Sequence, residues 1–234
     1  MKILFLLPPS EGKKSENNDF NEILSFHFKK PLDIAENVTE KYLKCSWKRF
    51  KEWLQLNRNI NSWETIEAIK RYSWVMFNAI DYSWMNTSWK DFFENKFLIL
   101  SWMYGIVEPL DKIWNYKLPI ESKWLIDFWW DTVVKEINTL EVDYVVNLLP
   151  ISYSKLILWK NKKLWEEFKK IRNFKIININ FLKSDWNKIS HWVKKIKWEW
   201  IKNICEKWIE DYKNFWWEVF EWENGVVDVN IMSK

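Results

Sequence analysis

The pattern of apolar and polar positions begins with a buried strand followed by helices. Ile3–Leu7 is a continuous apolar run, typical of a strand that is buried on both faces. The polar stretch Ser10–Asp19 that follows is predicted to be a loop. Apolar side chains then recur at helical spacing within Ala35–Leu56, and a further helix is predicted over Trp63–Tyr72.

The rest of the chain continues this alternation. Short apolar runs predict strands at Val75–Phe77, Phe97–Leu100, Tyr144–Leu148, Phe174–Leu182, Ile189–His191, Trp217–Phe220 and Val226–Ile231. Helices are predicted over Thr87–Glu94, Asp127–Leu140, Tyr153–Ile171 and Val193–Glu210. Strands alternate with helices early, and a hairpin around Trp186 follows late. This order predicts a mixed α/β fold, in which residues 1–234 form a single domain with a central mixed β-sheet surrounded by helices.

The glycine and tryptophan content changes how several of these positions are interpreted. The chain has 3 glycines and 21 tryptophans, whereas a usual share of roughly 7% would give about 16 glycines. Trp186 lies in a short turn, where the backbone needs the positive φ that glycine adopts freely. We therefore interpret most tryptophans as glycines of a gene that uses an alternative genetic code, with UGA read as glycine. Trp53, Trp129 and Trp217 lie beside other large apolar residues and are kept as tryptophans.

A carbohydrate-binding surface is the alternative explanation for so many tryptophans. Its aromatic residues would alternate along strands or cluster on one face, and these do not. If tryptophan stands at every such position, each bulky side chain in a tight turn costs about 1–3 kcal/mol. The predicted fold is therefore that of the glycine form of the chain, and the tryptophan form is predicted to be poorly soluble.

Charge and cysteine content set mild limits on partners and compartment. Lys and Arg number 36 against 32 Asp and Glu, which permits a nucleic-acid partner without requiring one. Cys45 and Cys205 are far apart and have no pairing context, which favours the reducing cytoplasm. The first apolar run stops at Pro8-Pro9 and is too short to cross a bilayer. With two histidines and two scattered cysteines, no metal site and no cofactor is predicted.

The first segment with candidate chemistry is Leu7–Lys14, directly after the first predicted strand. Loops at the carboxyl ends of strands are where ligands bind in α/β sheets. Ser10 offers a hydroxyl, Glu11 a possible base and Lys13 a cation. The segment lacks the spacing of a Walker loop. A polar turn that merely caps the strand explains it equally well.

The second segment, Leu100–Asp111, contains Trp102. With glycine at this position, the segment is predicted to be a strand end, a glycine-rich turn and a short helix that stops at Pro109. Backbone amides at such a turn can face a phosphate.

The third segment, Ile189–Trp198, brings Lys194, Lys195 and Lys197 to the start of the last long helix. The helix dipole disfavours lysines there unless a polyanion or carboxylates offset them. A solvated basic face is the alternative interpretation. His191 is interpreted as a structural residue.

At these segments the chain resembles the YaaA peroxide-stress-resistance proteins, and the likeness covers nearly its whole length. The matching residues are Leu7–Lys13, Phe77-Asn78, Asp81-Tyr82, Leu100–Gly105, Pro109–Asp111, Tyr116–Leu118, Phe128–Asp131, Val146–Leu148 with Tyr153, Ile189-Ser190 and Lys194-Lys195. Trp102, Trp130 and Trp198 complete family motifs when read as glycine, which supports the interpretation of the codons.

The resemblance implies a cytoplasmic α/β protein with a basic cleft and a helix-hairpin-helix-like element. Such a protein binds double-stranded DNA and limits iron-dependent oxidative damage during peroxide stress. Lys13, Lys194, Lys195 and Lys197 would then contact phosphates. Glu108 stands where the family usually has arginine, which counts against a phosphate contact there. Lys197 also replaces an arginine, so a point charge is kept while bidentate geometry is lost.

An enzyme acting on a nucleotide or on a base in DNA is the alternative function. The candidate catalytic residues are those predicted to lie at strand ends, namely Ser10, Glu11, Asn78, Asp81, Tyr104 and Asp111. A buried carboxylate among them serves as general acid or base if its pKa is tuned toward neutrality. A polar network that only holds loops together explains the same residues. Direct iron binding is the weakest hypothesis, because no facial-triad spacing is present.

Overall fold

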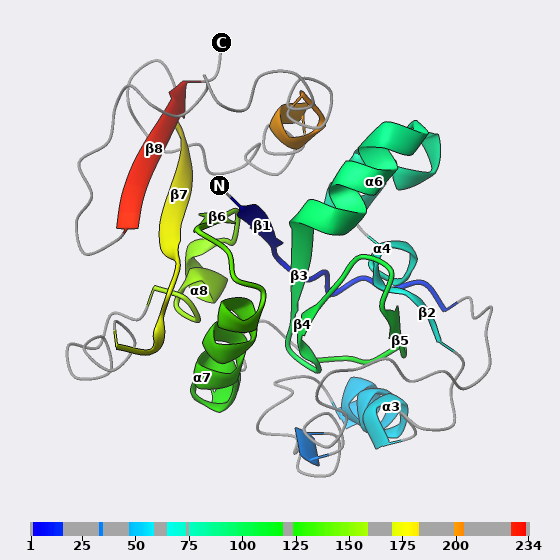
Figure 1. Ribbon diagram of the computed structural model, residues 1–234. Helices are drawn as coiled ribbons and strands as arrows, with labels where there is room; N and C mark the ends of the chain where they lie inside the picture. The colour runs from blue at the N-terminus through cyan, green and yellow to red at the C-terminus, as the bar shows by residue number, and fades with distance from the viewer. Residues whose placement is uncertain are drawn as a thin grey trace.

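A mixed β-sheet forms the centre of the molecule (Figure 1). The computed structural model describes residues 2–15, 33–34, 47–58, 65–73, 75–118, 124–158, 170–182, 199–203 and 226–232. Within these ranges six strands form one sheet in the order β4-β3-β1-β6-β7-β8. The strands are β1 (Ile3–Leu7), β3 (Phe97–Ser101), β4 (Gly105–Val107), β6 (Tyr144–Asn147), β7 (Lys175–Leu182) and β8 (Val226–Met232). Among these six described strands, β3 and β4 pair in antiparallel fashion and the other neighbours pair in parallel.

Helices and a small ribbon surround this sheet. The ribbon consists of β2 (Ile66–Glu67) and β5 (Lys112–Ile113), which pair in antiparallel fashion. The helices are α3 (Trp47–Arg58), α4 (Ala68–Arg71), α5 (Val75–Ile80), the 3-10 turn η1 (Tyr82–Trp84), α6 (Thr87–Lys96), α7 (Trp124–Thr139) and α8 (Ile151–Ser154). The predicted mixed α/β fold with a central sheet is therefore confirmed.

The core is built around β1, whose five residues are all buried. Phe5 of β1 lies beside its register partner Phe97 of β3, with the ring centroids 4.7 Å apart. Phe93 of α6 stacks on Phe97 at 4.5 Å, and Phe92 meets it edge-on at 6.1 Å. Full burial of each such ring contributes about 1.5–3 kcal/mol. The residues of β1 form a continuous apolar run because β1 is a central strand, with a neighbouring strand on each side, and because α6 covers one of its faces.

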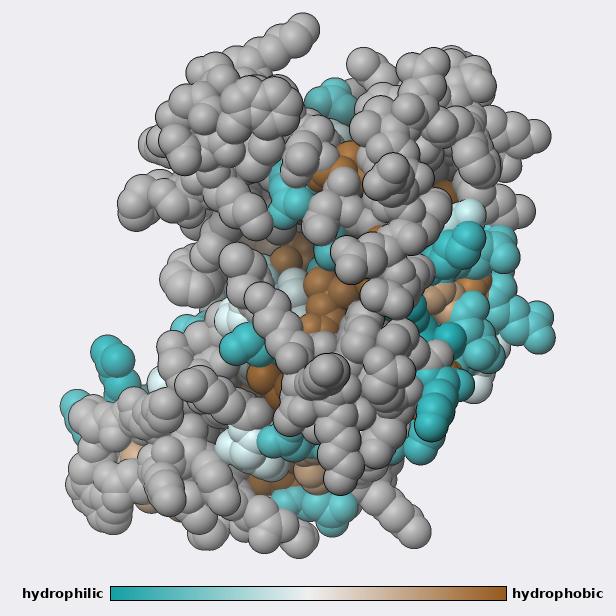
Figure 2. Space-filling view, turned by 90° about the vertical axis from the view of Figure 1, so that its left-hand side faces the viewer, coloured by the Kyte–Doolittle hydropathy of each residue, from teal (hydrophilic) through white to brown (hydrophobic). Residues whose placement is uncertain are grey.

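Local sequence fixes where α6 begins and ends. Asn86 is its N-cap, because the Oδ1 atom accepts a hydrogen bond of 2.9 Å from the amide of Trp89. The helix ends at Lys96, and its C-cap Phe97 has an extended backbone and begins β3 (Figure 1). On the side of the molecule that carries β7 and β8, apolar side chains of the described residues lie along the middle of the face (Figure 2).

Helix α7 packs on the turn between β3 and β4. The indole Nε1 of buried Trp129 donates a hydrogen bond of 2.8 Å to the carbonyl of Trp102. Its ring lies against Gly105, which has a φ of +79°. A Cβ atom at Gly105 would lie 2.8 Å from the ring, so glycine is required by both conformation and space. Trp129 is thus an integral part of the core, as the sequence predicted.

Three predictions of secondary structure are wrong. Val75–Phe77 is the start of α5 rather than a strand, because three apolar residues are too few to distinguish the two. Of the predicted helix Trp63–Tyr72, the described residues begin at Thr65 and are helical at Ala68–Arg71, since Ile66–Glu67 pairs with β5. The segment after the turn at Trp102 forms β4 rather than a short helix, because it pairs with β3. Tertiary strand pairing overrides local preference in the last two cases.

The C-terminal third is described only in part. Strand β8 pairs in parallel with β7 along its full length (Figure 1). Of the predicted helix Tyr153–Ile171, residues 153–154 lie in α8 and residues 170–171 are helical, while residues 155–158 form a turn. The predicted strands Ile189–His191 and Trp217–Phe220 lie outside the described residues, as does most of the predicted helix Val193–Glu210. Among the described residues, no helix combines the length and apolarity needed to cross a bilayer.

The tryptophans of the described part differ in their surroundings. Trp84 exposes 84% of its surface, whereas Trp102 exposes 2%. The Nε1 atom of Trp102 is buried, and no partner for it lies within the described part of the chain. The non-glycine residues with positive φ in that part are Asp81 and Glu141, so none of its tryptophans has this conformation. Trp186 lies outside it, and the use of an alternative genetic code stays a prediction.

Candidate functional site

The loop that follows β1 is fixed by hydrogen bonds to the segment after α4. The amide of Ser73 donates to the carbonyl of Gly12 at 2.9 Å, and the amide of Lys14 donates to the carbonyl of Arg71 at 2.9 Å. A Cβ atom at Gly12 would lie 3.0 Å from the Ser73 carbonyl oxygen, so the close approach favours glycine. The loop is therefore a rigid structure at the carboxyl end of a central strand, the place where ligands bind in such sheets.

Lys13 extends from this loop over two aromatic rings. Its Nζ atom donates a hydrogen bond of 2.9 Å to the carbonyl of Ser10. The same atom lies 4.0 Å from the centre of the Tyr116 ring and 5.2 Å from that of Tyr72. The negative faces of the two rings thus stabilise the ammonium, which the loop carbonyl holds in place.

Burial and neighbouring charges act against the ammonium of Lys13. Burial is the main reason that the pKa of Lys13 lies well below its usual value of 10.5. The positive charges of Lys117 and Arg71 lower this pKa further, whereas Glu11 raises it. Three basic side chains therefore converge on the loop, and an anionic ligand would favour the charged form of Lys13.

Lys117 is held in place through its backbone by Asn57. The side chain of this fully buried residue of α3 accepts a hydrogen bond of 2.8 Å from the amide of Lys117 and donates one of 2.7 Å to its carbonyl. The Lys117 ammonium reaches the carbonyl of Glu11 at 3.0 Å. Burial lowers the pKa of Lys117, and the carboxylates of Glu11 and Glu52 raise it.

Arg71 joins the loop to the small ribbon. The residue is fully buried, and its Nη1 atom donates to the carbonyl of Lys14 at 2.7 Å. Its Nε atom donates to the carbonyl of Ile113 in β5 at 3.3 Å. Burial lowers the pKa of Arg71 to about 10, which leaves it positively charged at neutral pH.

A chain of buried hydroxyl groups lies beneath Lys13. The hydroxyl of Tyr116 is 2.8 Å from that of Tyr72 and 2.9 Å from that of Ser101. Ser101 also accepts from the amide of Tyr104 at 3.1 Å, and the hydroxyl of Tyr104 accepts from the amide of Trp114 at 3.2 Å. Burial raises the pKa of Tyr116 to about 12 and raises that of Tyr72 well above its usual value. The hydroxyls thus stay protonated at neutral pH and form a neutral hydrogen-bonded network.

The structure brings four of the predicted site residues together. Lys13 lies over the hydroxyl network, to which Tyr104 belongs, and Glu11 is an exposed loop residue next to Lys117. Ser10 is buried, and its hydroxyl donates to the carbonyl of Ser73. The Ser10 hydroxyl therefore holds the loop rather than facing a base. We call this group the Lys13 site; it comprises Ser10, Glu11, Lys13, Arg71, Tyr72, Ser101, Tyr104, Tyr116 and Lys117.

The other predicted catalytic residues have different neighbours. Asn78 is exposed on α5, and Asp81 is an exposed residue in left-handed conformation directly after it. The strand end at which both were predicted to lie is absent, because this segment is helical. Asp111 accepts a hydrogen bond of 2.8 Å from the amide of Glu108. Burial, with smaller effects from Glu108 and Glu136, raises the pKa of Asp111 to about 6.

The remaining candidates fall in other parts of the chain. Lys194, Lys195 and Lys197 lie outside the described residues. Within the described ranges, His, Cys, Asp and Glu form no group of three or more that could hold a metal ion.

Sequence reasoning missed Arg71, Tyr72 and Ser101 and gave Lys117 no role. Tyr116-Lys117 was a motif that matched the family, and this was the available signal for Lys117. Arg71 and Tyr72 lay in a predicted helix, and nothing in the local pattern indicates that they are buried. Their roles depend on the pairing of the loop after β1 with the segment after α4.

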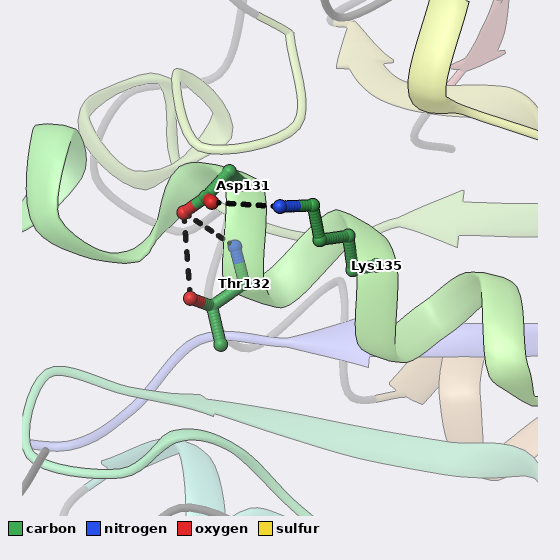
Figure 3. Close-up of polar contacts among 3 residues, drawn as sticks. All are labelled: Asp131, Thr132 and Lys135. Atoms are coloured by element: carbon green, nitrogen blue, oxygen red, sulfur yellow. Dashed lines mark hydrogen bonds and ion pairs between the residues drawn. The ribbon is translucent and has the colours of Figure 1, made fainter.

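The carboxylate of the matching residue Asp131 serves α7 itself (Figure 3). Its Oδ1 atom accepts from the amide of Thr132 at 2.8 Å and from the hydroxyl at 3.4 Å, and Oδ2 pairs with Lys135 at 3.1 Å. Asp131 and Lys135 are one helical turn apart, with the side chains 37% and 64% exposed, so the pair contributes about 0.5 kcal/mol or less. Figure 3 shows these contacts within one helix.

Known proteins resemble this chain over most of its length. A UPF0246 protein of Rickettsia peacockii (strain Rustic) is 29% identical over 174 residues, which are 69% of this chain and 67% of that protein. A UPF0246 protein of Malacoplasma penetrans (strain HF-2) is 32% identical over 177 residues, which are 67% of this chain and 70% of that protein. A UPF0246 protein of Rickettsia rickettsii (strain Iowa) is 30% identical over 160 residues, which are 63% of this chain and 61% of that protein. The chain thus spans 61% to 70% of the length of these relatives.

The family model described as "Peroxide stress protein YaaA" matches residues 1–224. This match includes β1, the loop with Lys13 and the segments that supply the rest of the Lys13 site. It confirms the resemblance found in the motifs. The chain therefore belongs to the YaaA family of peroxide stress proteins.

Proposed function

We propose that this protein acts during peroxide stress by binding double-stranded DNA, and that Lys13 and Lys117 contact a phosphate of the bound strand. The observation that carries the proposal is the convergence of three cationic side chains from separate segments on one loop. Lys117 and Arg71 both lower the pKa of Lys13, so the three charges lie close enough to repel one another. A phosphate placed among them would offset this repulsion.

Protection of the DNA from oxidative damage would follow because the bound protein covers the strand. Bound protein limits iron-dependent oxidative damage because it shields the strand from oxidants formed nearby. The family description supports the setting of peroxide stress. The two distant cysteines favour the cytoplasm as the compartment.

Salt dependence of binding tests the proposal. Fluorescence anisotropy measures the affinity for a labelled duplex over a range of salt concentrations. Each phosphate neutralised on duplex DNA contributes about 0.9 to the slope of log K against log salt concentration. We expect Lys117→Gln to reduce this slope by about 0.9, because glutamine keeps a donor for the carbonyl of Glu11 but loses the charge.

Lys135→Gln is the matched control, since it removes an exposed lysine that pairs with Asp131 on its own helix. It should leave the slope unchanged. Binding that does not respond to salt, or slopes that are the same for both variants, would contradict the proposal.

The second candidate function is an enzyme that acts on a nucleotide or on a base in DNA. It is favoured by the lowered pKa of Lys13, since a neutral amine is a general base or a nucleophile. The hydroxyl network below Lys13 adds neutral donors and acceptors. Mass spectrometry of duplexes that carry an oxidised base distinguishes the two functions. Turnover that is lost in Lys13→Met supports the enzyme, whereas unchanged duplex at saturating protein supports DNA binding alone.

A further inference from the structure

Two aromatic rings stack across the carboxyl edge of the central sheet. Trp102 is the first residue after β3, and Tyr153 belongs to α8, which follows β6. Their ring centroids lie 4.9 Å apart, with 28° between the ring planes. Both side chains are buried, with 2% of Trp102 and 4% of Tyr153 exposed.

The order of strands places this stack at the topological switch point of the sheet, where successive strands are added on opposite sides of β1. Strands β3 and β6 are the two neighbours of β1, one on each side. Adjacent strands lie about 4.8 Å apart, so a contact from the end of β3 to the end of β6 crosses the end of β1. The chain adds β3 on one side of β1 and β6, β7 and β8 on the other. Ligands bind at such a topological switch point in α/β sheets.

Tyr153 is held as a fixed platform. Asn147 at the end of β6 donates to the Oγ atom of Ser154 at 3.2 Å and to Oδ1 of Asn178 at 2.7 Å. Ser154 in turn donates to the carbonyl of Pro150 at 3.0 Å. The residue next to Tyr153 is thus joined to the end of β6 and, through Asn147, to the middle of β7, which keeps the ring in position when its neighbour changes.

The indole of Trp102 fits this place poorly. Its buried Nε1 atom finds no partner among the described residues. The neighbouring Trp129 instead donates to the backbone carbonyl of Trp102, a contact that any residue at position 102 would keep. Gly105 follows three residues later. With glycine at position 102, the same backbone would leave open a space of the size and shape of a bicyclic aromatic ring, facing Tyr153.

We propose that this space is a binding site for a planar heteroaromatic ring of the size of a nucleobase, which stacks on Tyr153 in the chain that carries glycine at position 102. The proposal goes beyond DNA binding and does not depend on it. Ser101 connects the ring site to the Lys13 site, because its hydroxyl bonds to that of Tyr116, over which the Lys13 ammonium lies. The ring site and the Lys13 site are therefore joined through Ser101, which directly precedes position 102.

The test replaces Trp102 by glycine and measures binding of 2-aminopurine riboside by its fluorescence, excited beyond the absorption of tryptophan. We expect saturable quenching with Trp102→Gly and an increase in its melting temperature with ligand concentration. The original chain should bind no riboside. Trp84→Gly is the matched control, because it removes an indole that also follows a serine but is 84% exposed; it should bind no riboside either.

Removing the platform tests the stacking itself. In the Trp102→Gly background, Tyr153→Leu should weaken binding about tenfold or more, the size expected for loss of base–aromatic stacking.

Two probes distinguish the source of the ring: the free riboside, and a duplex that contains a single 2-aminopurine. Binding of the riboside indicates a free nucleotide, and a signal from the duplex alone indicates a base extruded from DNA. Either result supports the site, whatever the salt titration shows about DNA binding.

The proposal is overturned if folded Trp102→Gly binds neither probe, or if Tyr153→Leu leaves the affinity unchanged. It is also overturned if indole binds and both probes fail, since the space would then accept any apolar ring. Trp102→Ala is the second variant, in case the glycine variant does not fold. If neither variant folds, the indole is a required part of the core and no ring site exists.

Discussion

Gly105→Ala is the substitution whose cost the structure defines most closely. Gly105 begins β4 with a φ of +79°, and an added Cβ atom would lie 2.8 Å from Cε3 and 2.9 Å from Cζ3 of Trp129. The indole is unable to move away easily, because Trp129 is fully buried and its Nε1 atom donates to the carbonyl of Trp102. Alanine therefore meets an unfavourable backbone conformation and a steric clash at the same time.

The backbone strain and the steric clash together set how far the free energy of unfolding falls. A non-glycine residue in left-handed conformation costs about 1–2 kcal/mol. Overpacking of a core contact costs about 1–3 kcal/mol more. The free energy of unfolding should thus fall by about 2–5 kcal/mol, and for a chain of this length each kcal/mol lowers the melting temperature by about 2–4 °C. Urea denaturation followed by circular dichroism measures this loss.

A double-mutant cycle separates strain from clash. In a Trp129→Leu background the smaller side chain leaves room for the methyl group, so the cost of Gly105→Ala should shrink to the backbone strain alone. A loss below about 0.5 kcal/mol for Gly105→Ala, or an equal loss in both backgrounds, would refute the reasoning. Gly12→Ala is a milder comparison, because its Cβ atom would lie 3.0 Å from the Ser73 carbonyl oxygen and its φ is not positive.

Two further predictions concern titrating groups. The raised pKa of Asp111, about 6 against 3.8, stabilises the fold below pH 4 and loses this contribution as pH rises through about 6. Melting temperatures between pH 4 and 7 should therefore fall less steeply for Asp111→Asn, and parallel curves for both proteins would contradict this. The pKa of Lys13 lies well below 10.5, so its 13Cε resonance should titrate well below that pH; a midpoint at or above 10.5 would contradict the burial of the ammonium.

The strands of the core could be predicted from the sequence because their apolar residues form clear runs. Ile3–Leu7 is a continuous apolar run and Tyr144–Asn147 contains the buried pair Val145-Val146, as expected of parallel strands that are buried on both faces. Helix α7 was predicted nearly in full because its apolar residues recur at helical spacing. The start of α5 was predicted as a strand because a run of three apolar residues carries no period.

The site was less predictable, since it depends on contacts between distant segments. The loop after β1 was identified from its place behind a strand, and Lys13 with it. Arg71 and Lys117 are far from Lys13 in sequence, and both reach it only after the chain has folded. The pairing of Ser73 with Gly12 brings the first of them close, and Asn57 positions the second. No local pattern encodes either contact.

The place of β1 between β3 and β6 affects how the chain folds during synthesis. Ile3 pairs with Tyr144, which follows it by 141 residues. At about 5–20 residues per second, the ribosome needs roughly 7–28 s to supply this second neighbour. For that time the wholly apolar strand β1 has at least one open edge, which other nascent chains can pair with. Yield of folded protein should therefore depend on chaperones that cover short extended segments, and on slow folding set by these distant pairings.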